Sequence, residues 1–131
     1  EPKNNRSQLM ETDDNKLLVD DYNANPTSMR AAIENFRDMK VERRMVILGD
    51  MGELGESSWK AHQAIADLLV ESGFEHVWLV GPKFKAARHP FRTFDSVEQV
   101  KKALEIKKPK GYYILIKGSH STRLYDLPDF L

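Results

Sequence analysis

Short apolar runs alternate along the chain with segments whose apolar residues recur at helical spacing. The apolar runs predict strands at residues 17–19, 45–48, 77–80 and 112–116, and a weaker strand at 91–94. The helical spacing predicts amphipathic helices that begin near Asn25, Ser57 or Ser58, and Ser96, and a short helix at residues 84–87. Such alternation is typical of parallel βαβ units, in which helices cover both faces of the sheet. The sequence therefore predicts an α/β domain, a Rossmann-like three-layer sandwich with a mostly parallel sheet.

An N-terminal hairpin is predicted to add one antiparallel strand to this sheet. Residues 7–12 can pair with residues 17–21 across the Asp-Asp-Asn sequence at 13–15, whose side chains favour a tight turn. Residues 1–8 have the polar composition of a linker. The folded domain is therefore expected to begin near residue 9.

The apolar stripes of the first two helices predict which side chains reach the core. These stripes are Met29, Ala32, Ile33 and Phe36 in the first helix, and Ala61, Ile65, Leu68 and Leu69 in the second. Asn25 followed by Pro26 fits a helix cap and the first residue of a helix. His62 is placed on the polar side of the second helix and is given no functional role. Neither stripe implies a cofactor.

Four loops follow the predicted strands, and in a parallel sheet they meet at one edge. Three of the strands run into Gly49, Gly81 and Gly118, and residues 21–25 form the fourth loop. Glycine at these places suggests unusual dihedral angles or close approach of backbones. Ligands in open α/β sheets usually bind at this edge, where loop amides and helix N-termini converge. We therefore expect the functional site there, centred on the strand, loop and helix at 17–30.

Composition and motif patterns exclude several kinds of function. The 20 basic and 20 acidic residues give a formal net charge of zero, which favours neither a nucleic acid nor an anionic membrane as partner. The chain has no cysteine, no signal peptide and no apolar run near the roughly 18 residues of a membrane span, which is compatible with a cytosolic protein. Neither G-x-x-x-x-G-K-[ST] nor G-x-G-x-x-G after a strand occurs, so the domain is not expected to hold a nucleoside triphosphate by itself. G-x-S-x-G and paired metal ligands such as H-E-x-x-H are also missing, so neither nucleophilic catalysis nor a metal site is predicted.

Four segments resemble one protein family, in the order in which the family carries them. They are NRSQ at residues 5–8, DDYNANPTSM at 20–29, LGDMGELGE at 48–56 and KGSHSTRL at 117–124. Together they are similar to the C-terminal domain of the Mur ligases. The sequence Y-N-A-N-P after an aspartate is the most specific, and it resembles the UDP-N-acetylmuramoyl-tripeptide:D-alanyl-D-alanine ligase branch. On this resemblance, residues 1–8 are an interdomain linker and residues 9–131 are the mobile C-terminal lid domain.

The resemblance implies an ATP-dependent amide ligase of peptidoglycan precursor synthesis in the cytoplasm. In this family ATP phosphorylates the terminal carboxylate of UDP-N-acetylmuramoyl-tripeptide, and the amine of D-alanyl-D-alanine attacks the acyl phosphate. ATP and Mg²⁺ are held mainly by a central domain, and the UDP-sugar is held by an N-terminal domain. These two domains would be the partners of this chain in a monomeric enzyme. The C-terminal domain would supply no catalytic residue and would be inactive alone.

The resemblance assigns ATP contacts to Arg6, Asp21 and Asn23. Arg6 matches an arginine that contacts the ribose or the phosphates, and a guanidinium suits both; the alternative is a solvated linker charge. Asp21 matches an aspartate on the ribose, and a strand-end carboxylate that accepts loop amides is equally compatible with the sequence. Asn23 and Asn25 face the region of nucleotide and acceptor in the family. For Asn25 the helix cap is the stronger expectation.

The remaining substrate contacts are implied for two loops. Asp50 and Glu53 are candidates for the ammonium group of a dipeptide, and solvated loop carboxylates are the alternative. Lys117, Ser119 and Ser121 suit a carboxylate or a phosphate. A solvated loop with a capping serine is an equal alternative for these three.

One other class of function is compatible with the residues: an autonomous Rossmann-like module that binds a small nucleotide or anion without catalysis. The two classes predict different affinities. A lid domain should bind ATP weakly or undetectably when isolated, whereas an autonomous module should bind its ligand tightly.

Overall fold

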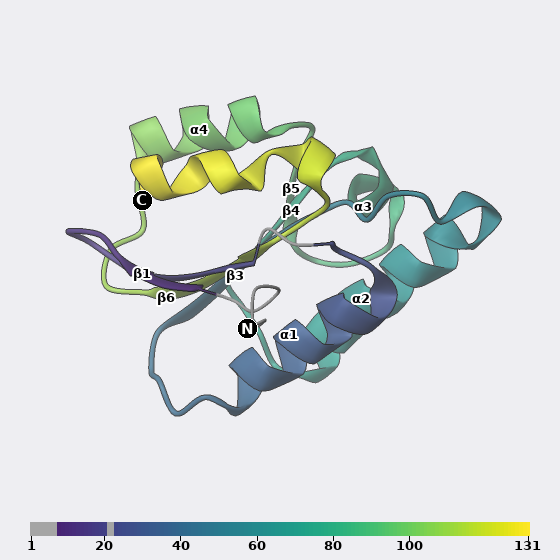
Figure 1. Cartoon of the computed structure of the whole chain (residues 1–131), viewed down its shortest axis with the longest axis horizontal. Helices are drawn as coiled ribbons and strands as arrows, with labels where there is room; N and C mark the ends of the chain where they lie inside the picture. The colour runs from purple at the N-terminus through teal and green to yellow at the C-terminus, as the bar shows by residue number, and fades with distance from the viewer. Residues whose placement is uncertain (1–7, 21–22) are drawn as a thin grey trace.

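The structure is a computed structural model that describes residues 8–20 and 23–131 (Figure 1). Within these residues a sheet of six strands has the order β1-β2-β6-β3-β4-β5. The strands are β1 (Gln8–Glu11), β2 (Lys16–Asp20), β3 (Arg44–Gly49), β4 (Val77–Val80), β5 (Arg92–Phe94) and β6 (Tyr113–Lys117). β1 runs antiparallel to β2, and the other neighbouring strands are parallel. The mostly parallel sheet with an N-terminal hairpin is therefore confirmed.

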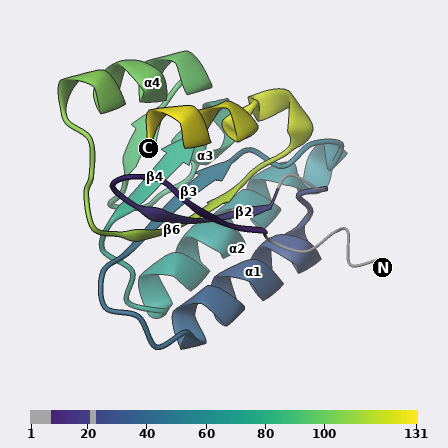
Figure 2. The ribbon, with the colours of Figure 1, turned by 60° about the vertical axis from the view of Figure 1, so that its left-hand side comes forward.

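Helices cover both faces of this sheet (Figures 1 and 2). The helices are α1 (Pro26–Asp38), α2 (Ser58–Glu71), α3 (Pro82–Ala86) and α4 (Val97–Ile106), with 3-10 helices η2 (Gly55–Ser57), η3 (His120–Thr122) and η4 (Leu124–Phe130). α1 and α2 lie side by side on one face, and α4 lies beside η4 on the other. The predicted three-layer α/β sandwich is confirmed.

The central strand β3 separates two apolar cores. Val46 and Leu48 belong to the core under α1 and α2, whereas Met45 and Ile47 belong to the core under α4 and η4. Because successive side chains of a strand point to opposite faces, a strand covered on both faces must be apolar throughout. β1 is the opposite case: all its residues are exposed, and Leu9 has 62% of its surface in solvent.

One helix starts at a residue other than the one predicted, and one predicted serine cap is not formed, for local reasons. The short helix α3 begins at Pro82 rather than residue 84, because Gly81 adopts φ 118° and turns the chain directly after β4. α2 begins at Ser58, and Ser57 Oγ donates to the Leu54 carbonyl (2.7 Å) instead of capping a helical amide. The C-terminal helix η4, which the apolar pattern did not predict, supplies buried leucines to the core under α4.

Asn25 begins α1 as the sequence predicted. Its Oδ1 accepts a hydrogen bond from the Ser28 amide (2.9 Å), and Ser28 Oγ accepts one from the Asn25 amide (3.0 Å). Pro26 is the first helical residue, and three of the four predicted stripe residues, Met29, Ile33 and Phe36, are buried. This reciprocal capping box fixes the chain where it leaves the loop after β2.

The cap should contribute measurably to stability. Asn25→Ala removes the acceptor for the Ser28 amide, and we expect the free energy of unfolding to fall by about 1 kcal/mol. Urea denaturation measures this change, and Asn25→Asp should retain most of the stability. Asn35→Ala, on the exposed face of the same helix, is the matched control; an equal loss in both alanine variants would contradict the capping role.

Candidate functional site

The ends of four parallel strands lie together at the carboxyl edge of the sheet. Asp20 of β2 is the register partner of Lys117 of β6, which is in turn the partner of Leu48 of β3. Gly49 of β3 is the partner of Val80 of β4. The loops after these strands are therefore neighbours, as the sequence predicted.

Lys117 forms a buried ion pair at this edge. Its Nζ lies 2.9 Å from Asp20 Oδ2, with side-chain exposures of 1% for lysine and 10% for aspartate. The same ammonium donates to the Asn23 carbonyl (3.2 Å). Lys117 therefore belongs to the end of β6 and fixes the loop after β2. The alternative of a solvated loop lysine was wrong, and sequence analysis missed Asp20 as the ion-pair partner of Lys117.

Two glycines allow the loops after β3 and β6 to touch. A Cβ on Gly118 would lie 2.8 Å from Gly49 Cα, and one on Gly49 would lie 2.7 Å from Thr122 Oγ1. The Ser119 amide donates across this contact to the Asp50 carbonyl (3.0 Å). The close backbone approach suggested by the glycines is therefore an approach of one loop to the other.

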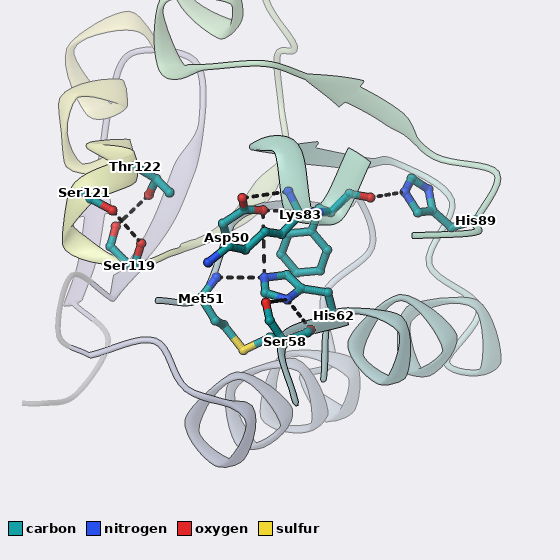
Figure 3. Close-up of polar contacts among 10 residues, drawn as sticks. Asp50, Met51, Ser58, His62, Lys83, His89, Ser119, Ser121 and Thr122 are labelled. Carbon is teal, nitrogen blue, oxygen red and sulfur yellow. Dashed lines mark hydrogen bonds and ion pairs between the residues drawn. The ribbon is translucent and has the colours of Figure 1, made fainter. Parts of the chain in front are cut away.

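Asp50 holds the N-terminus of α3 (Figure 3). Its two carboxylate oxygens accept hydrogen bonds from the Lys83 and Phe84 amides, both at 2.9 Å. Gly81 is needed beside it, because a Cβ there would lie 2.4 Å from the carboxylate. Asp50 is 8% exposed, so it is not a solvated loop carboxylate. Its geometry gives it a structural role, and its contact with a substrate stays a prediction.

His62 is fully buried, and its placement on the polar side of α2 was wrong. Nδ1 donates to the Ser58 carbonyl (2.7 Å), and Nε2 accepts from the Met51 amide (3.0 Å), which defines a neutral imidazole. The ring meets Phe84 edge-on with centroids 4.7 Å apart, and Nε2 lies 3.9 Å from Asp50 Oδ1. Figure 3 shows this ring between α2 and the loop after β3. This side of α2 is covered by that loop and α3, and a polar side chain can be buried there because both ring nitrogens have partners.

A cavity of about 340 Å³ opens beside these loops. Asp50, Ser119 and Ser121 line it, so the structure brings these three predicted residues together. The two serine hydroxyls lie 3.1 Å apart. Lys83 and Arg123 also line the cavity, and sequence analysis missed both cations. Hydroxyls, cations and carboxylates around one cavity could hold a small zwitterion.

The cavity rim carries an exposed ion pair. Lys85 Nζ lies 2.6 Å from Asp95 Oδ1, and Asp95 lines the cavity. The hydrogen bond from Lys85, aided by its charge, lowers the pKa of Asp95. This carboxylate is therefore ionised at neutral pH.

The other predicted residues lie elsewhere or outside the described part of the chain. Asn23, Asn25 and Glu53 are exposed and do not line this cavity, and Glu53 adopts φ 60°. Arg6 and Asp21 lie outside the described residues. No group of three or more metal-ligating side chains is assembled in the described ranges. None of the described helices is long and apolar enough to cross a membrane.

Comparison with known proteins finds one family. The family model "Mur ligase, glutamate ligase domain" matches residues 5–120. A UDP-N-acetylmuramoyl-tripeptide–D-alanyl-D-alanine ligase of Treponema pallidum is 32% identical over 88% of this chain. A relative of the same name in Escherichia coli is 31% identical over 87% of the chain. The chain spans only 27% and 26% of these two relatives.

Solved structures show the same fold. The MurF ligase of Thermotoga maritima, in complex with ADP, has a TM-score of 0.79 at 22% identity and is matched over 96% of this chain and 30% of its own. A MurF structure from Acinetobacter baumannii has a TM-score of 0.76 at 28% identity, over 93% of this chain and 29% of its own.

Removal of the buried histidine should loosen the loop after β3. His62→Ala leaves the Met51 amide and the Ser58 carbonyl without a partner, and we expect the free energy of unfolding to fall by about 3 kcal/mol. Denaturant unfolding measures the loss, and hydrogen exchange should show faster exchange of the Met51 amide. His120→Ala, at an exposed histidine, is the control. Unchanged protection of Met51 would contradict the assigned hydrogen bond.

The buried ion pair gives a second prediction. Lys117→Met leaves the Asp20 carboxylate without its ammonium in a buried position, which should cost about 3–5 kcal/mol of unfolding free energy. Adding Asp20→Asn should recover part of that loss. Lys60→Met, at an exposed lysine of α2, should change stability little. Equal stability of the Lys117→Met and Lys60→Met variants would refute the pairing.

Proposed function

Because the chain belongs to the family of Mur ligase, glutamate ligase domains, we propose that it is the C-terminal domain of an ATP-dependent amide ligase. The proposed enzyme joins D-alanyl-D-alanine to UDP-N-acetylmuramoyl-tripeptide in the cytoplasmic synthesis of peptidoglycan precursors. The observation that carries this proposal is that relatives named for this activity match nearly the whole chain, from Treponema pallidum to Escherichia coli. The 340 Å³ cavity at the carboxyl edge of the sheet, the carboxyl-edge cavity, supports it, because it combines cations, hydroxyls and carboxylates.

The reaction needs groups that these 131 residues do not carry. The sequence has no P-loop, and the described residues assemble no metal cluster, so ATP and Mg²⁺ are held mainly by a central domain in this proposal. ATP supplies the phosphoryl group that activates the tripeptide carboxylate. The dipeptide amine then forms the amide bond, and phosphate leaves with the electron pair of the broken acyl–oxygen bond.

The proposed contribution of this chain is to position nucleotide and dipeptide. Arg6, Asp21 and Asn23 are assigned to the ATP side. The Lys117 ammonium holds the Asn23 carbonyl, so it acts on the nucleotide side by fixing this loop. A direct contact of Lys117 with a substrate is also part of the proposal. In such a contact the ammonium would be shared between the substrate and Asp20.

The dipeptide is assigned to the other loops of the same edge. Ser119 and Ser121 present hydroxyls in the cavity, and Asp50 shapes it by holding α3. Asn25 and Glu53 border the edge from neighbouring loops and are assigned to the acceptor side. Residues 1–8 serve as the linker and 9–131 as a lid in a monomeric enzyme, which explains why the isolated domain should be inactive.

Steady-state kinetics of the full-length protein that carries this chain test the proposal. Phosphate release should require ATP, the UDP-linked tripeptide and D-alanyl-D-alanine together. Asp21→Ala removes a charged hydrogen-bond acceptor for the ribose, and we expect the KM for ATP to rise about tenfold while the KM for D-alanyl-D-alanine stays unchanged. Asp13→Ala, in the exposed hairpin turn, is the control.

Two results would count against this function. Unchanged ATP kinetics in the Asp21→Ala enzyme would remove this residue from the site. Tight ATP binding by the isolated 131-residue chain, measured by calorimetry, would favour an autonomous nucleotide-binding module over a lid.

A further inference from the structure

A second hollow lies at the amino ends of the parallel strands, on the edge of the sheet opposite to the candidate site. It measures about 570 Å³ and is bordered by the starts of β3 to β6 and by the end of α4. Figure 1 shows α4 ending on the side away from the loops that follow β3 and β4. We call this hollow the amino-edge groove. It shares no lining residue with the carboxyl-edge cavity.

The groove is lined by cations and by no acidic side chain among the described residues. The cations are Arg43, Arg92, Lys107, Lys108 and Lys110. Lys108 is paired with Asp14 at 2.7 Å, whereas the other four have no ion pair with a described residue. In a chain with no net charge, this is a local excess of positive charge. Unpaired cations around a concave surface attract an anionic ligand.

Both arginines of the groove lie close to aromatic rings. The Arg43 guanidinium lies 4.5 Å from the centre of the Tyr112 ring, and that of Arg92 lies 5.2 Å from the Trp78 ring and 4.7 Å from the Phe94 ring. A cation–π contact does not use up the N–H groups of a guanidinium, which can still bind a carboxylate with two hydrogen bonds. Because these side chains are already ordered, binding costs them little further entropy.

An exposed apolar residue lies beside these cations. Ile106, the last residue of α4, lines the groove and has 86% of its surface in solvent. It is the most exposed of the large apolar side chains in the described part of the chain. Arginine, tryptophan and tyrosine around an apolar centre with a charged rim are typical of protein interfaces.

The spacing of the arginines favours a ligand with separated charges. Arg43 directly precedes β3 and Arg92 begins β5, with β4 between them. Two strand spacings put the two backbones about 10 Å apart. A single phosphate does not need so wide a site, whereas a peptide with carboxylates on either side of an apolar residue fits it.

We propose that the amino-edge groove is a docking site for an acidic amphipathic segment of a partner protein. The carboxylates of the segment bind Arg43 and Arg92, and its apolar side chain packs on Ile106. Lys107 and Lys110 add attraction from the rim. This site is independent of the proposed ligase activity, because it lies at the other edge of the sheet.

Tryptophan fluorescence can test the proposal. The chain has two tryptophans, so Trp59→Phe leaves Trp78 in the groove as the only reporter. The probe is the blocked peptide Glu-Glu-Leu-Glu-Glu. We expect a saturable change in Trp78 emission, and about tenfold weaker binding after Arg43→Gln or Arg92→Gln. Arg30→Gln, at an exposed arginine of α1, should leave the affinity unchanged.

A double-mutant cycle tests the apolar contact. Ile106→Ser should weaken binding of the leucine peptide about tenfold, but should not alter binding of Glu-Glu-Ser-Glu-Glu. If an arginine variant loses its fold by circular dichroism, the double variant of Lys107→Gln and Lys110→Gln, at two exposed side chains, tests the same charge requirement.

Several results would overturn the proposal. They are the absence of a saturable signal, equal affinity in the arginine variants and their control, and equal binding of Lys-Lys-Leu-Lys-Lys. Displacement of the peptide by inorganic pyrophosphate at a lower concentration than that of the peptide itself would instead assign the groove to a phosphate ligand.

Discussion

The buried ion pair between Lys117 and Asp20 is the contact on which the carboxyl edge depends. Parallel pairing of β2 with β6 sets the two side chains opposite each other at the last register position of both strands. A charge so far from solvent is tolerated only with its partner, so removal of either side chain would leave an uncompensated buried charge at this register position. The same ammonium donates a hydrogen bond to the Asn23 carbonyl, so it also fixes the loop that leads to α1.

Polar contacts join the remaining loops into one layer above the sheet. Gly49 and Gly118 let two loops meet, Asp50 holds α3, and His62 anchors the loop after β3 to α2. Each of the hydrogen bonds has a backbone amide or carbonyl as at least one partner, and backbone groups have fixed directions. The surface offered to a ligand or to another domain is therefore built before binding, and association does not have to order it.

Much of the fold could be predicted from the sequence, because strands buried on both faces and amphipathic helices leave clear periodic patterns. The buried polar residues could not be predicted as easily, because hydropathy alone assigns them to solvent. His62 shows that a signal existed: together with Ile65, Ala66 and Leu69 it occupies positions i, i+3, i+4 and i+7, and all four are buried. The helical spacing of His62 predicts a buried side chain, whereas the polarity of its imidazole suggests an exposed one.

The positions of the candidate site residues were predictable to different degrees. Ser119, Ser121 and Asp50 do line one cavity, as expected of loops that follow neighbouring strands. The pairing of Lys117 with Asp20 could not be predicted, because it depends on which strand lies next to β6. Sequence order does not fix this neighbour: β6 is inserted between β2 and β3, so residues nearly one hundred positions apart meet.

The contrast between β1 and β3 determines where this chain can change during evolution. The four apolar side chains at positions 45–48 of β3 are each committed to one of two cores, so a slip of one residue would exchange their contents. β1 commits no side chain to either core and contributes through its backbone. Substitutions should therefore accumulate freely along β1. At positions 45–48 of β3, only apolar residues of similar volume should be tolerated. The outermost strand beside β2 is thus the part of the sheet most open to acquiring a new surface.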